Sequence, residues 1–291
     1  MKNVRRLLDK WDIRPSKGLG QNFLVNQTTL EKIVAAAELA PHDVVLEVGP
    51  GLGTLTRRLA REAKHVVAVE LDQRLIPVLQ SELSNLSNVT LIQGDILAFD
   101  PAILVSTASG QRTASNTHYK VVANLPYYIT SAIVRHLLEA SLKPQRMVIT
   151  VQREVAERIV AEPGRMSLLA VSVQFYGQPR LLFRIKPGNF YPSPDVESAI
   201  VRIDLHPTLP LSSQETPAFF RVVRSGFSQR RKQLHNALAA GLGKPSDAVA
   251  AQLSEAGVDP HRRAQSLSIE EWVRITRALS EPRNRVPRGP A

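Results

Sequence analysis

Short apolar runs rich in β-branched residues alternate with helix-forming segments through the first half of the sequence. The runs lie at residues 44–48, 65–69, 89–93, 119–123 and 147–151. Strands that alternate with helices predict a parallel sheet covered by helices on both faces, so the expected fold class is α/β. Ligands of such sheets bind beyond the carboxyl ends of the strands. The residues that directly follow each run are therefore the first candidates for a functional site.

The second half of the sequence has a different pattern. Two more strands are predicted at 180–186 and 197–204, and beyond 206–210 the periodicity is only helical, at about 217–227, 229–241, 246–256 and 268–280. Residues 105–118 are small and polar and are expected to form a surface loop. We predict four parts, which are a basic arm at 1–26, an α/β domain at 27–206, a smaller all-helical domain at 207–281 and a disordered tail at 282–291.

The charge balance is strongly basic. A net charge of +11 and a pI near 10.2 favour a polyanionic partner, because each contact to a phosphate releases condensed counterions. The alternative is a solvated basic surface with no nucleic-acid partner. The sequence contains no cysteine, which excludes disulfides, thiolate metal sites and a cysteine nucleophile. No metal site is expected.

Targeting signals are missing from the sequence. No apolar run approaches the roughly 20 residues of a membrane span. The stretch from Met1 to Lys17 is charged throughout and lacks the apolar core of a signal peptide. We therefore expect a cytoplasmic protein that does not associate with membranes.

A glycine turn and two acids follow the first three runs. Gly49-Pro-Gly51-Leu-Gly53 comes after the first run, Glu70 ends the second, and Asp95 follows the third. The turn is not the dinucleotide fingerprint, because Thr54 stands where that motif has its last glycine. A carboxylate at such a strand end can bind ribose hydroxyls. Each acid alone is more often a solvated loop residue, but together they predict a nucleoside ligand.

The form of the turn favours one nucleoside ligand over another. With Glu47 directly before the glycines, the set fits S-adenosylmethionine better than NAD, because a sulfonium donor needs no pyrophosphate cradle. The absence of cysteine argues against methylation of cytosine C5, which requires a thiolate nucleophile.

The fourth run ends in Asn124-Leu-Pro-Tyr127. The side-chain carbonyl of Asn124 and the main-chain carbonyl of Leu125 can accept hydrogen bonds from both protons of an amine. Tyr127 can stack on a base that has left its helix, although a lone aromatic residue is more often part of a core. The motif therefore predicts a catalytic site for an exocyclic amine.

Six segments resemble the KsgA/RsmA family of rRNA adenine dimethyltransferases along about residues 14 to 280. They are Lys17-Gly-Leu-Gly-Gln-Asn-Phe-Leu24, Glu47-Val-Gly-Pro-Gly-Leu-Gly-Thr-Leu-Thr56, Asn124-Leu-Pro-Tyr-Tyr-Ile-Thr130, Val151-Gln-Arg-Glu-Val-Ala-Glu-Arg158, Asn189-Phe-Tyr-Pro-Ser-Pro194 and Phe227-Ser-Gln-Arg-Arg-Lys232. The resemblance implies a Rossmann-like class I methyltransferase domain followed by a small helical domain.

The resemblance also implies an activity and a set of site residues. The family places two methyl groups on N6 of each of two adjacent adenosines, in a hairpin loop near the 3′ end of small-subunit (16S) rRNA, during ribosome biogenesis. It implies that Phe190 stacks on the second face of the base. The donor contacts that the resemblance implies are Asn22, Leu24, Gly49, Glu70, Asp95 and Asn124. Gly51 of the glycine turn is expected to contact the donor as well.

The sequence departs from the family in three places. Asp195 stands where the family often has a lysine, the segment after Pro163-Gly164 is shorter than usual, and the 105–118 loop is longer. None of the three falls on an expected catalytic residue.

Basic residues gather at both ends of the chain. From residue 206 on there are thirteen Lys and Arg against seven Asp and Glu, and residues 1–30 have six against two. We hypothesise that both ends contact phosphates of the RNA. The residues expected to do so in the helical domain are Arg221, Arg224, Arg230, Arg231 and Lys232.

Two other functions stay open at this point. The macrolide-resistance methyltransferases share the fold and an Asn-containing motif but modify large-subunit rRNA. A non-catalytic ribosome-assembly factor would hold immature subunits without methylating them. The leading prediction is a monomer that acts on the small ribosomal subunit rRNA of a pre-30S particle.

Overall fold

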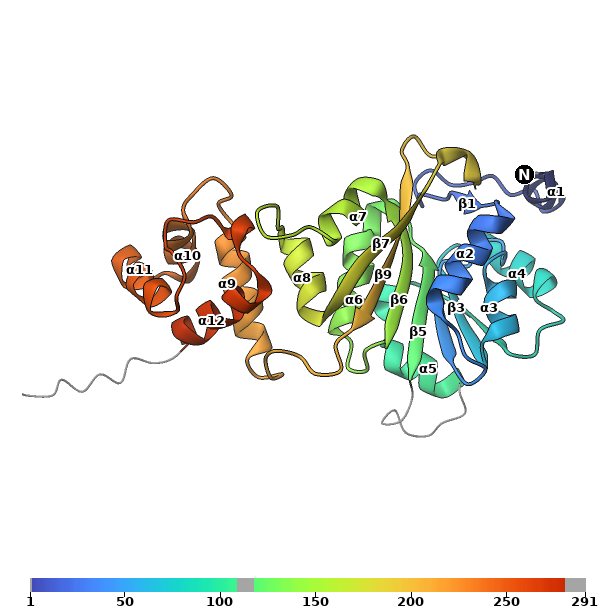
Figure 1. The fold of residues 1–291 in the computed structure, drawn as a ribbon. Coiled ribbons are helices and arrows are strands. Elements are labelled where there is room, and N and C mark those ends of the chain that lie inside the picture. The colour runs from blue at the N-terminus through green and yellow to red at the C-terminus, as the bar shows by residue number, and fades with distance from the viewer. Residues whose placement is uncertain (1, 109–117, 281–291) are drawn as a thin grey trace, which may run out of the picture. The chain divides into compact units, whose positions relative to one another are not determined.

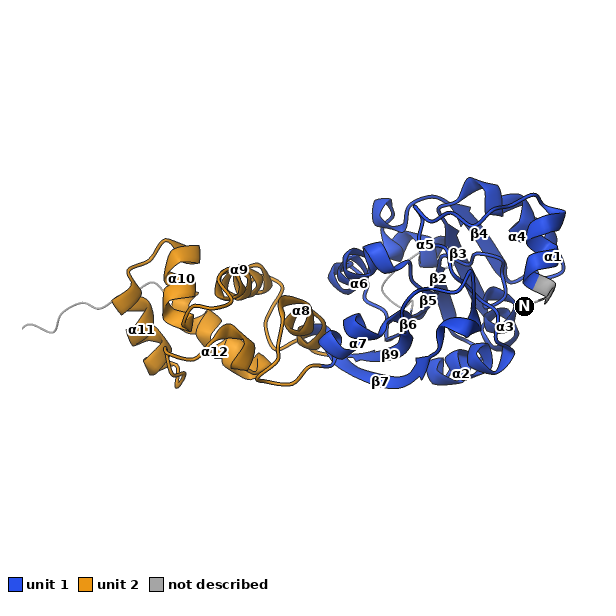
Figure 2. Cartoon of the chain, turned by 90° about the horizontal axis from the view of Figure 1, so that it is seen from above, with its two compact units in different colours: residues 1–160, 176–207 blue, residues 161–175, 208–291 orange. Residues whose placement is uncertain are grey.

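The computed structural model describes residues 2–108 and 118–280. The chain forms two compact units, one of residues 1–160 with 176–207 and the other of residues 161–175 with 208–291 (Figure 2). The sequence had placed all of 27–206 in one domain. In the structure, residues 161–175 group with the second unit instead, because the helix α8 (Leu168–Tyr176) directs Phe175 onto Phe219, with ring centroids 4.4 Å apart.

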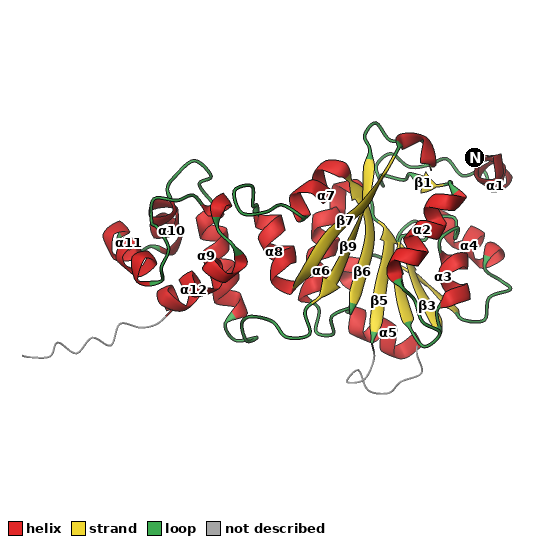
Figure 3. Cartoon of the chain, in the orientation of Figure 1, coloured by secondary structure: helices red, strands yellow, loops and turns green. Residues whose placement is uncertain are grey.

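The first unit is built on a seven-stranded sheet (Figures 1 and 3). In sheet order the strands are β4 (Val89–Gln93), β3 (His65–Glu70), β2 (Val44–Val48), β5 (Tyr119–Asn124), β6 (Arg146–Gln152), β9 (Ser198–Leu205) and β7 (Gly177–Ile185). The first five run parallel, as predicted. The two late strands are confirmed as strands, but β9 runs antiparallel to both β6 and β7.

Helices cover both faces of the sheet. The helices α2 (Gln27–Ala37) and α3 (Thr56–Glu62) pack on one face, where Leu30, Ile33 and Leu59 meet Val45 and Val122 in one buried cluster. The helices α5 (Pro101–Ala108) and α6 (Thr130–Glu139) lie on the other face (Figure 2). The helix α4 (Ile76–Glu82) and the short helix α7 (Arg153–Ile159) complete the unit.

Local signals explain several of these boundaries. The helix α2 begins after an N-terminal cap, because the Asn26 side chain accepts a hydrogen bond from the Thr29 main-chain N–H at 2.9 Å. Pro77 stands in the first turn of α4, where its missing N–H removes no hydrogen bond of the helix. Part of the predicted 105–118 loop is helical, since α5 extends to Ala108, and residues 109–117 lie outside the described residues.

The predicted N-terminal arm is an ordered part of the first unit. Its helix α1 (Lys2–Lys10) buries Val4 and Leu8, one helical turn apart, in a cluster with Leu79 of α4. The chain then reaches the short strand β1 (Phe23–Leu24), which pairs antiparallel with β8 (Phe190–Tyr191). The segment that precedes α2 is thereby held beside the sheet.

The second unit contains the helices predicted after residue 207. They are α9 (Thr216–Phe227), α10 (Leu234–Leu242), α11 (Ser246–Glu255) and α12 (Ile269–Ser280). The predicted 229–241 helix begins only at Leu234, because the chain first turns, with the Lys232 N–H bonded to the Gln229 carbonyl oxygen at 2.9 Å. The predicted disordered tail lies outside the described residues. Among the helices that the structure describes, none has the length and apolar character of a membrane span.

Candidate functional site

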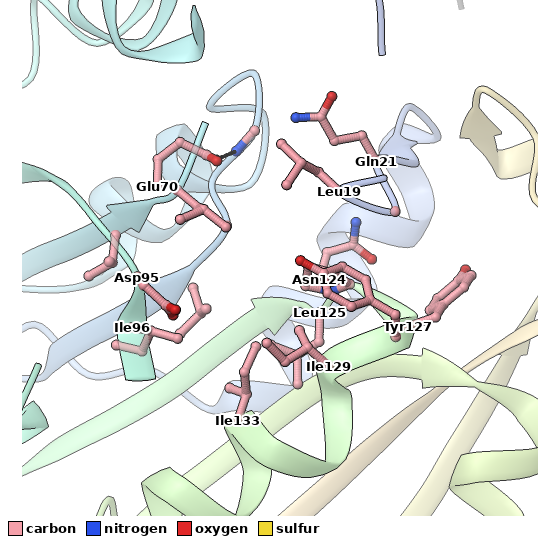
Figure 4. Close-up of a pocket in the computed structure, with 18 of the residues that line it drawn as sticks. Leu19, Gln21, Glu70, Asp95, Ile96, Asn124, Leu125, Tyr127, Ile129 and Ile133 are labelled. Atoms are coloured by element: carbon pink, nitrogen blue, oxygen red, sulfur yellow. Dashed lines mark hydrogen bonds between the residues drawn. The ribbon is translucent and has the colours of Figure 1, made fainter. Parts of the chain in front are cut away.

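A pocket lies at the carboxyl ends of β2, β3, β4 and β5, where the sheet topology predicted a ligand site. Figure 4 shows Glu70 and Asp95 on one side of it and Asn124, Leu125 and Tyr127 on the other. Residues 19–23 of the N-terminal segment also line it. The structure therefore brings most of the predicted donor and catalytic residues together in one cavity.

The glycine turn after β2 forms one wall. Gly51 has a φ of +61°, and a Cβ at this position would lie 3.0 Å from Cδ1 of Phe23. For both reasons, a residue larger than glycine would be strained at this position. The Gly51 N–H donates to Oε2 of Glu70 at 3.0 Å, which links the turn to the end of β3.

The Glu70 carboxylate is held by main-chain donors on both oxygens. Oε2 accepts from Gly51, and Oε1 accepts from the Asp72 N–H at 2.8 Å. The side chain is only 6% exposed, and burial raises the pKa of Glu70 above its ordinary value. A carboxylate fixed in this way at a strand end is suited to accept hydrogen bonds from two ribose hydroxyls.

Glu47 lies directly before the glycines and is 1% exposed. Its Oε2 has no hydrogen-bond partner among the described residues. Burial, with a smaller contribution from the charge of Glu70, raises the pKa of Glu47 to about 8. The group is therefore mainly a neutral acid at pH 7.

Asp95 follows β4 at the edge of the pocket and is exposed. Its Oδ1 accepts the N–H of Leu97 at 3.0 Å and caps a short 3-10 helix, η2 (Ile96–Ala98). Its other oxygen has room to accept from an adenine amino group, and the buried Ile96 beside it offers an apolar surface to a flat ring.

Asn124 is the last residue of β5. Its amide nitrogen donates to the main-chain oxygen of Asn22 at 3.0 Å. Leu125 is buried, and its N–H donates to the Thr150 carbonyl oxygen at 3.3 Å. The ring of Tyr127 is fixed by a 2.6 Å hydrogen bond between its hydroxyl and Oγ of Ser198. Burial raises the pKa of Tyr127, so the phenol stays neutral.

The model of the family described as "Ribosomal RNA adenine dimethylase" matches residues 14–281. This chain belongs to the ribosomal RNA adenine dimethylase family. The match extends over both units, and the dimethylase resemblance predicted from the six sequence segments is confirmed.

Curated relatives of this dimethylase carry the name "Ribosomal RNA small subunit methyltransferase A". One from Dehalococcoides mccartyi is 47% identical over 275 residues, which cover 94% of this chain and 92% of the relative. One from Pelotomaculum thermopropionicum is 42% identical over 276 residues, which cover 94% of each chain.

Two solved structures are also similar to this dimethylase. The 23S rRNA methyltransferase ErmE has 30% identity and a TM-score of 0.70, with 89% of this chain and all of that chain covered. A dimethyladenosine transferase from Plasmodium falciparum, at 22% identity and a TM-score of 0.72 over 87% and 95% of the two chains, shows the same fold. The α/β methyltransferase fold with a helical C-terminal part is thus confirmed.

The dimethylase family uses S-adenosylmethionine as its methyl donor, and the pocket suits that molecule. The buried Glu70 lines the pocket, and the side-chain-free Gly51 leaves space beside it. Among the described residues, no group of three or more His, Asp or Glu could hold a metal ion.

Two predicted site residues of the dimethylase do not line the pocket. Phe190 is 1% exposed and Leu24 is 3% exposed, and both lie in the cluster beneath α2. They are partners in the β1–β8 pair, whose alternation turns Phe190 inward and leaves Tyr191 partly exposed. In this structure the Phe190 ring packs in that cluster, and its stacking role stays a prediction.

Tyr128 and Gln21 are polar residues of the pocket to which sequence reasoning gave no role. Tyr128 is 59% exposed and lines the mouth, and the main signal for it was its place directly after Tyr127. Gln21 stood within a quoted motif but was given no role.

The five basic residues predicted to bind RNA are all exposed in the second unit. Arg221 and Arg224 lie on one side of α9, whose opposite side buries Phe219 and Val223. The other three, Arg230 to Lys232, occupy the turn between α9 and α10. None of the five takes part in an ion pair within the described chain, so their charges are available to a ligand.

Proposed function

We propose that this chain dimethylates N6 of two adjacent adenosines in a hairpin loop near the 3′ end of small-subunit rRNA, during ribosome biogenesis. The observation that carries the proposal is the shared pocket, which places the Asn124-Leu-Pro-Tyr127 motif opposite Glu70 and Asp95. Support for the subunit comes from the relatives, which are named small-subunit methyltransferases and match 94% of this chain.

The donor half of the pocket consists of the glycine turn and the two strand-end acids. In this proposal Glu70 binds the ribose hydroxyls of the donor and Asp95 binds its adenine amino group. The main chain approaches the donor closely at Asn22, Gly49 and Gly51. S-adenosylmethionine supplies an electrophilic methyl group when bound. Leu24 acts indirectly, because its main-chain oxygen accepts from Thr54 Oγ1 at 3.5 Å and so ties β1 to the glycine turn.

The acceptor half consists of Asn124 and Leu125. An adenine N6 amine is a weak nucleophile because its lone pair is delocalised into the ring. Hydrogen bonds from its two protons to Oδ1 of Asn124 and to the Leu125 carbonyl oxygen favour a tetrahedral nitrogen whose lone pair points at the methyl group. No strong base is required before attack, since the proton leaves after nitrogen has become cationic.

Tyr127 holds the extruded base. Because its hydroxyl is bonded to Ser198, the direction of the Tyr127 side chain is fixed and the ring stays at its place in the pocket. Stacking of a base on such a ring contributes about 1–3 kcal/mol. Positioning of the base against the donor is the main source of the rate enhancement in this mechanism.

The basic residues of the second unit are assigned to phosphates of the rRNA. Their positive charge releases counterions on binding and carries no base specificity of its own. We expect the protein to act in the cytoplasm, as a monomer, on a pre-30S particle.

The two alternatives have less support. The identity to the 23S rRNA methyltransferase ErmE is 30%, against 47% for a relative named as a small-subunit methyltransferase. A non-catalytic assembly factor would not need the donor half of the pocket.

Labelled S-adenosylmethionine incubated with separated, undermethylated small and large subunits tests the substrate. We expect label in small-subunit rRNA, and label confined to the large subunit would contradict the proposal. Calorimetry tests catalysis independently of RNA, because a chain without measurable affinity for the donor cannot be the proposed enzyme.

A further inference from the structure

Residues 16–22 form a strap that runs across the pocket. Leu19 to Asn22 line the cavity, and Figure 4 shows Leu19 and Gln21 on the side of the pocket away from Ile129 and Ile133. The strap is held at two points, one on the donor half and one on the acceptor half. The two points lie on neighbouring residues, because Gln21 makes the first contact and Asn22 the second.

At the first point the strap is latched by Gln21. Its Nε2 donates to Oδ2 of Asp72 at 2.7 Å, and its Oε1 accepts the N–H of Ser16 at 2.7 Å. Both atoms of the amide are therefore engaged. A glutamine that only solvated the surface would not lie between a buried carboxylate and a main-chain donor.

Asp72 is a fixed anchor for this latch. It is 6% exposed, and Arg74 donates to both of its oxygens, Nε to Oδ1 at 2.9 Å and Nη2 to Oδ2 at 2.7 Å. The main-chain N–H of the same residue donates to Glu70. The turn that follows β3 therefore holds two groups in place. They are the Glu70 carboxylate, which is proposed to bind the donor ribose, and the strap.

At the second point the strap contacts the proposed catalytic amide. The main-chain oxygen of Asn22, the residue after Gln21, accepts from Nδ2 of Asn124 at 3.0 Å. An asparagine amide can present either its oxygen or its nitrogen after a rotation of about 180°. While the main-chain oxygen of Asn22 accepts from Nδ2 of Asn124, only Oδ1 of Asn124 is available to the amine of the base. The amine requires an acceptor.

Displacement of the strap would remove this constraint. The amide of Asn124 could then turn its NH2 group toward the base, where two donors would face each other. The orientation of the Asn124 amide thereby depends on the main-chain position of Asn22, next to the residue that latches the strap.

We propose that Gln21 and Asp72 are positioning residues that latch the strap and so hold Asn124 with its oxygen toward the amine of the base. The proposal rests on the proposed function, because it takes Asn124 as the acceptor for the adenine N6 protons.

The variant Gln21→Glu tests the latch with little change of shape. It places a carboxylate oxygen where the amide nitrogen lies 2.7 Å from Asp72, so the two groups repel each other. Gln21→Ala removes both hydrogen bonds as a second test. In the double variant Gln21→Glu/Asp72→Asn, the new amide can donate to the new carboxylate, which restores the latch with its direction reversed. One of the two Arg74 hydrogen bonds to residue 72 is lost in the exchange. Gln80→Glu, on the exposed side of α4, makes the same chemical change away from the pocket.

The measurements are kcat at saturating donor and small subunits, the Kd for S-adenosylmethionine by calorimetry, and Tm. We expect both single variants at position 21 to lower kcat about tenfold or more, because a catalytic group out of place by about an ångström loses that much. We expect the donor Kd to change less than about threefold and the double variant to recover most of the lost kcat. Gln80→Glu should match the parent.

The possible outcomes distinguish a failure of the proposed function from a failure of the positioning role. A parent protein that methylates no subunit contradicts the proposed function. An active parent with unchanged kcat in both Gln21 variants overturns the positioning role alone. So does a loss that appears only in the donor Kd, or a double variant as slow as Gln21→Glu.

Discussion

Asn124 ends β5 with its amide nitrogen bonded to the main-chain oxygen of Asn22, which leaves its oxygen for the substrate. In the proposed mechanism this oxygen accepts one N6 proton in the transition state. A group with that role lowers kcat when it is removed and affects binding of the donor much less. The structure thus separates the expected effects of Asn124 on chemistry and on affinity.

Replacement of Asn124 by Ala should lower the rate of methyl transfer about 100-fold, since the amine loses a positioned acceptor. Single-turnover transfer to undermethylated small subunits measures this rate. Calorimetry provides the control, with a donor Kd within about tenfold of the parent value. A variant that transfers methyl groups at the parent rate would exclude Asn124 from the catalytic step.

Glu47 makes stability depend on pH in a predictable direction. Its pKa in the folded protein is about 8, against an ordinary value of 4.5, because its carboxyl is buried. Between these two values the folded protein binds a proton that the unfolded chain does not, so this group makes the free energy of unfolding fall as pH rises. The slope from one such group is at most about 1.4 kcal/mol per pH unit.

Glu47→Gln replaces the acid by a neutral amide of similar shape and removes this dependence. We expect the variant to have a higher Tm than the parent at pH 8 and above, and a Tm close to the parent value near pH 4.5. Thermal unfolding of both proteins across this range measures the difference. A difference in Tm that stays constant with pH would show that Glu47 is not protonated in the folded protein.

The site residues differ in how far the sequence could predict them. Glu70, Asp95 and Asn124 were accessible because each stands at the end of an apolar run, and topology then places such ends at one edge of a sheet. The burial of the Phe190 side chain could not be predicted, because its direction depends on the pairing of a two-residue strand with β1. The role of Gln21 depends on a partner 51 positions away, which no local pattern reveals.

At the scale of elements, the strands of the sheet were predictable and their directions only in part. The apolar, β-branched runs predicted the strands β2 to β6. The helices between these runs predicted that the strands are parallel. The strands β7 and β9 are joined without a crossover helix, so they form an antiparallel pair at the edge. The helix α1 carried an i, i+4 signal in Val4 and Leu8, but the high charge of the segment favoured an arm.

The turn between α9 and α10 is the element most directly tied to RNA binding. Charge reversal by Arg230→Glu, Arg231→Glu and Lys232→Glu should weaken binding of small-subunit RNA. If all three residues contact phosphates, the slope of log K against log salt should become shallower by about 2 units. Titrations at several salt concentrations measure this slope.

A matched control reverses three exposed charges on the α2–α3 side of the first unit, Lys32, Arg61 and Lys64. Both triple variants carry the same net charge, so a nonspecific effect of charge would change the two slopes equally. Equal slopes in the two variants would argue against a specific role for the turn after α9.

At the scale of the whole molecule, the chain passes between its two units more often than the sequence indicates. It enters the second unit at 161, returns at 176 and leaves again after 207. The apolar helix α8 could belong to either unit on its sequence alone, and its contact with α9 decides the matter. The two-part organisation was predictable because strand patterns stop at 205, whereas the early crossing depends on a long-range contact.

The central claim is that this molecule brings donor and adenine together in one pocket and methylates two adjacent adenosines. Mass spectrometry of small-subunit rRNA fragments, after incubation of undermethylated subunits with the protein and S-adenosylmethionine, tests it most directly. The account predicts two methyl groups on N6 of each of two neighbouring adenosines in one hairpin loop near the 3′ end. Unmodified fragments, or methyl groups at positions other than adenosine N6, would contradict it.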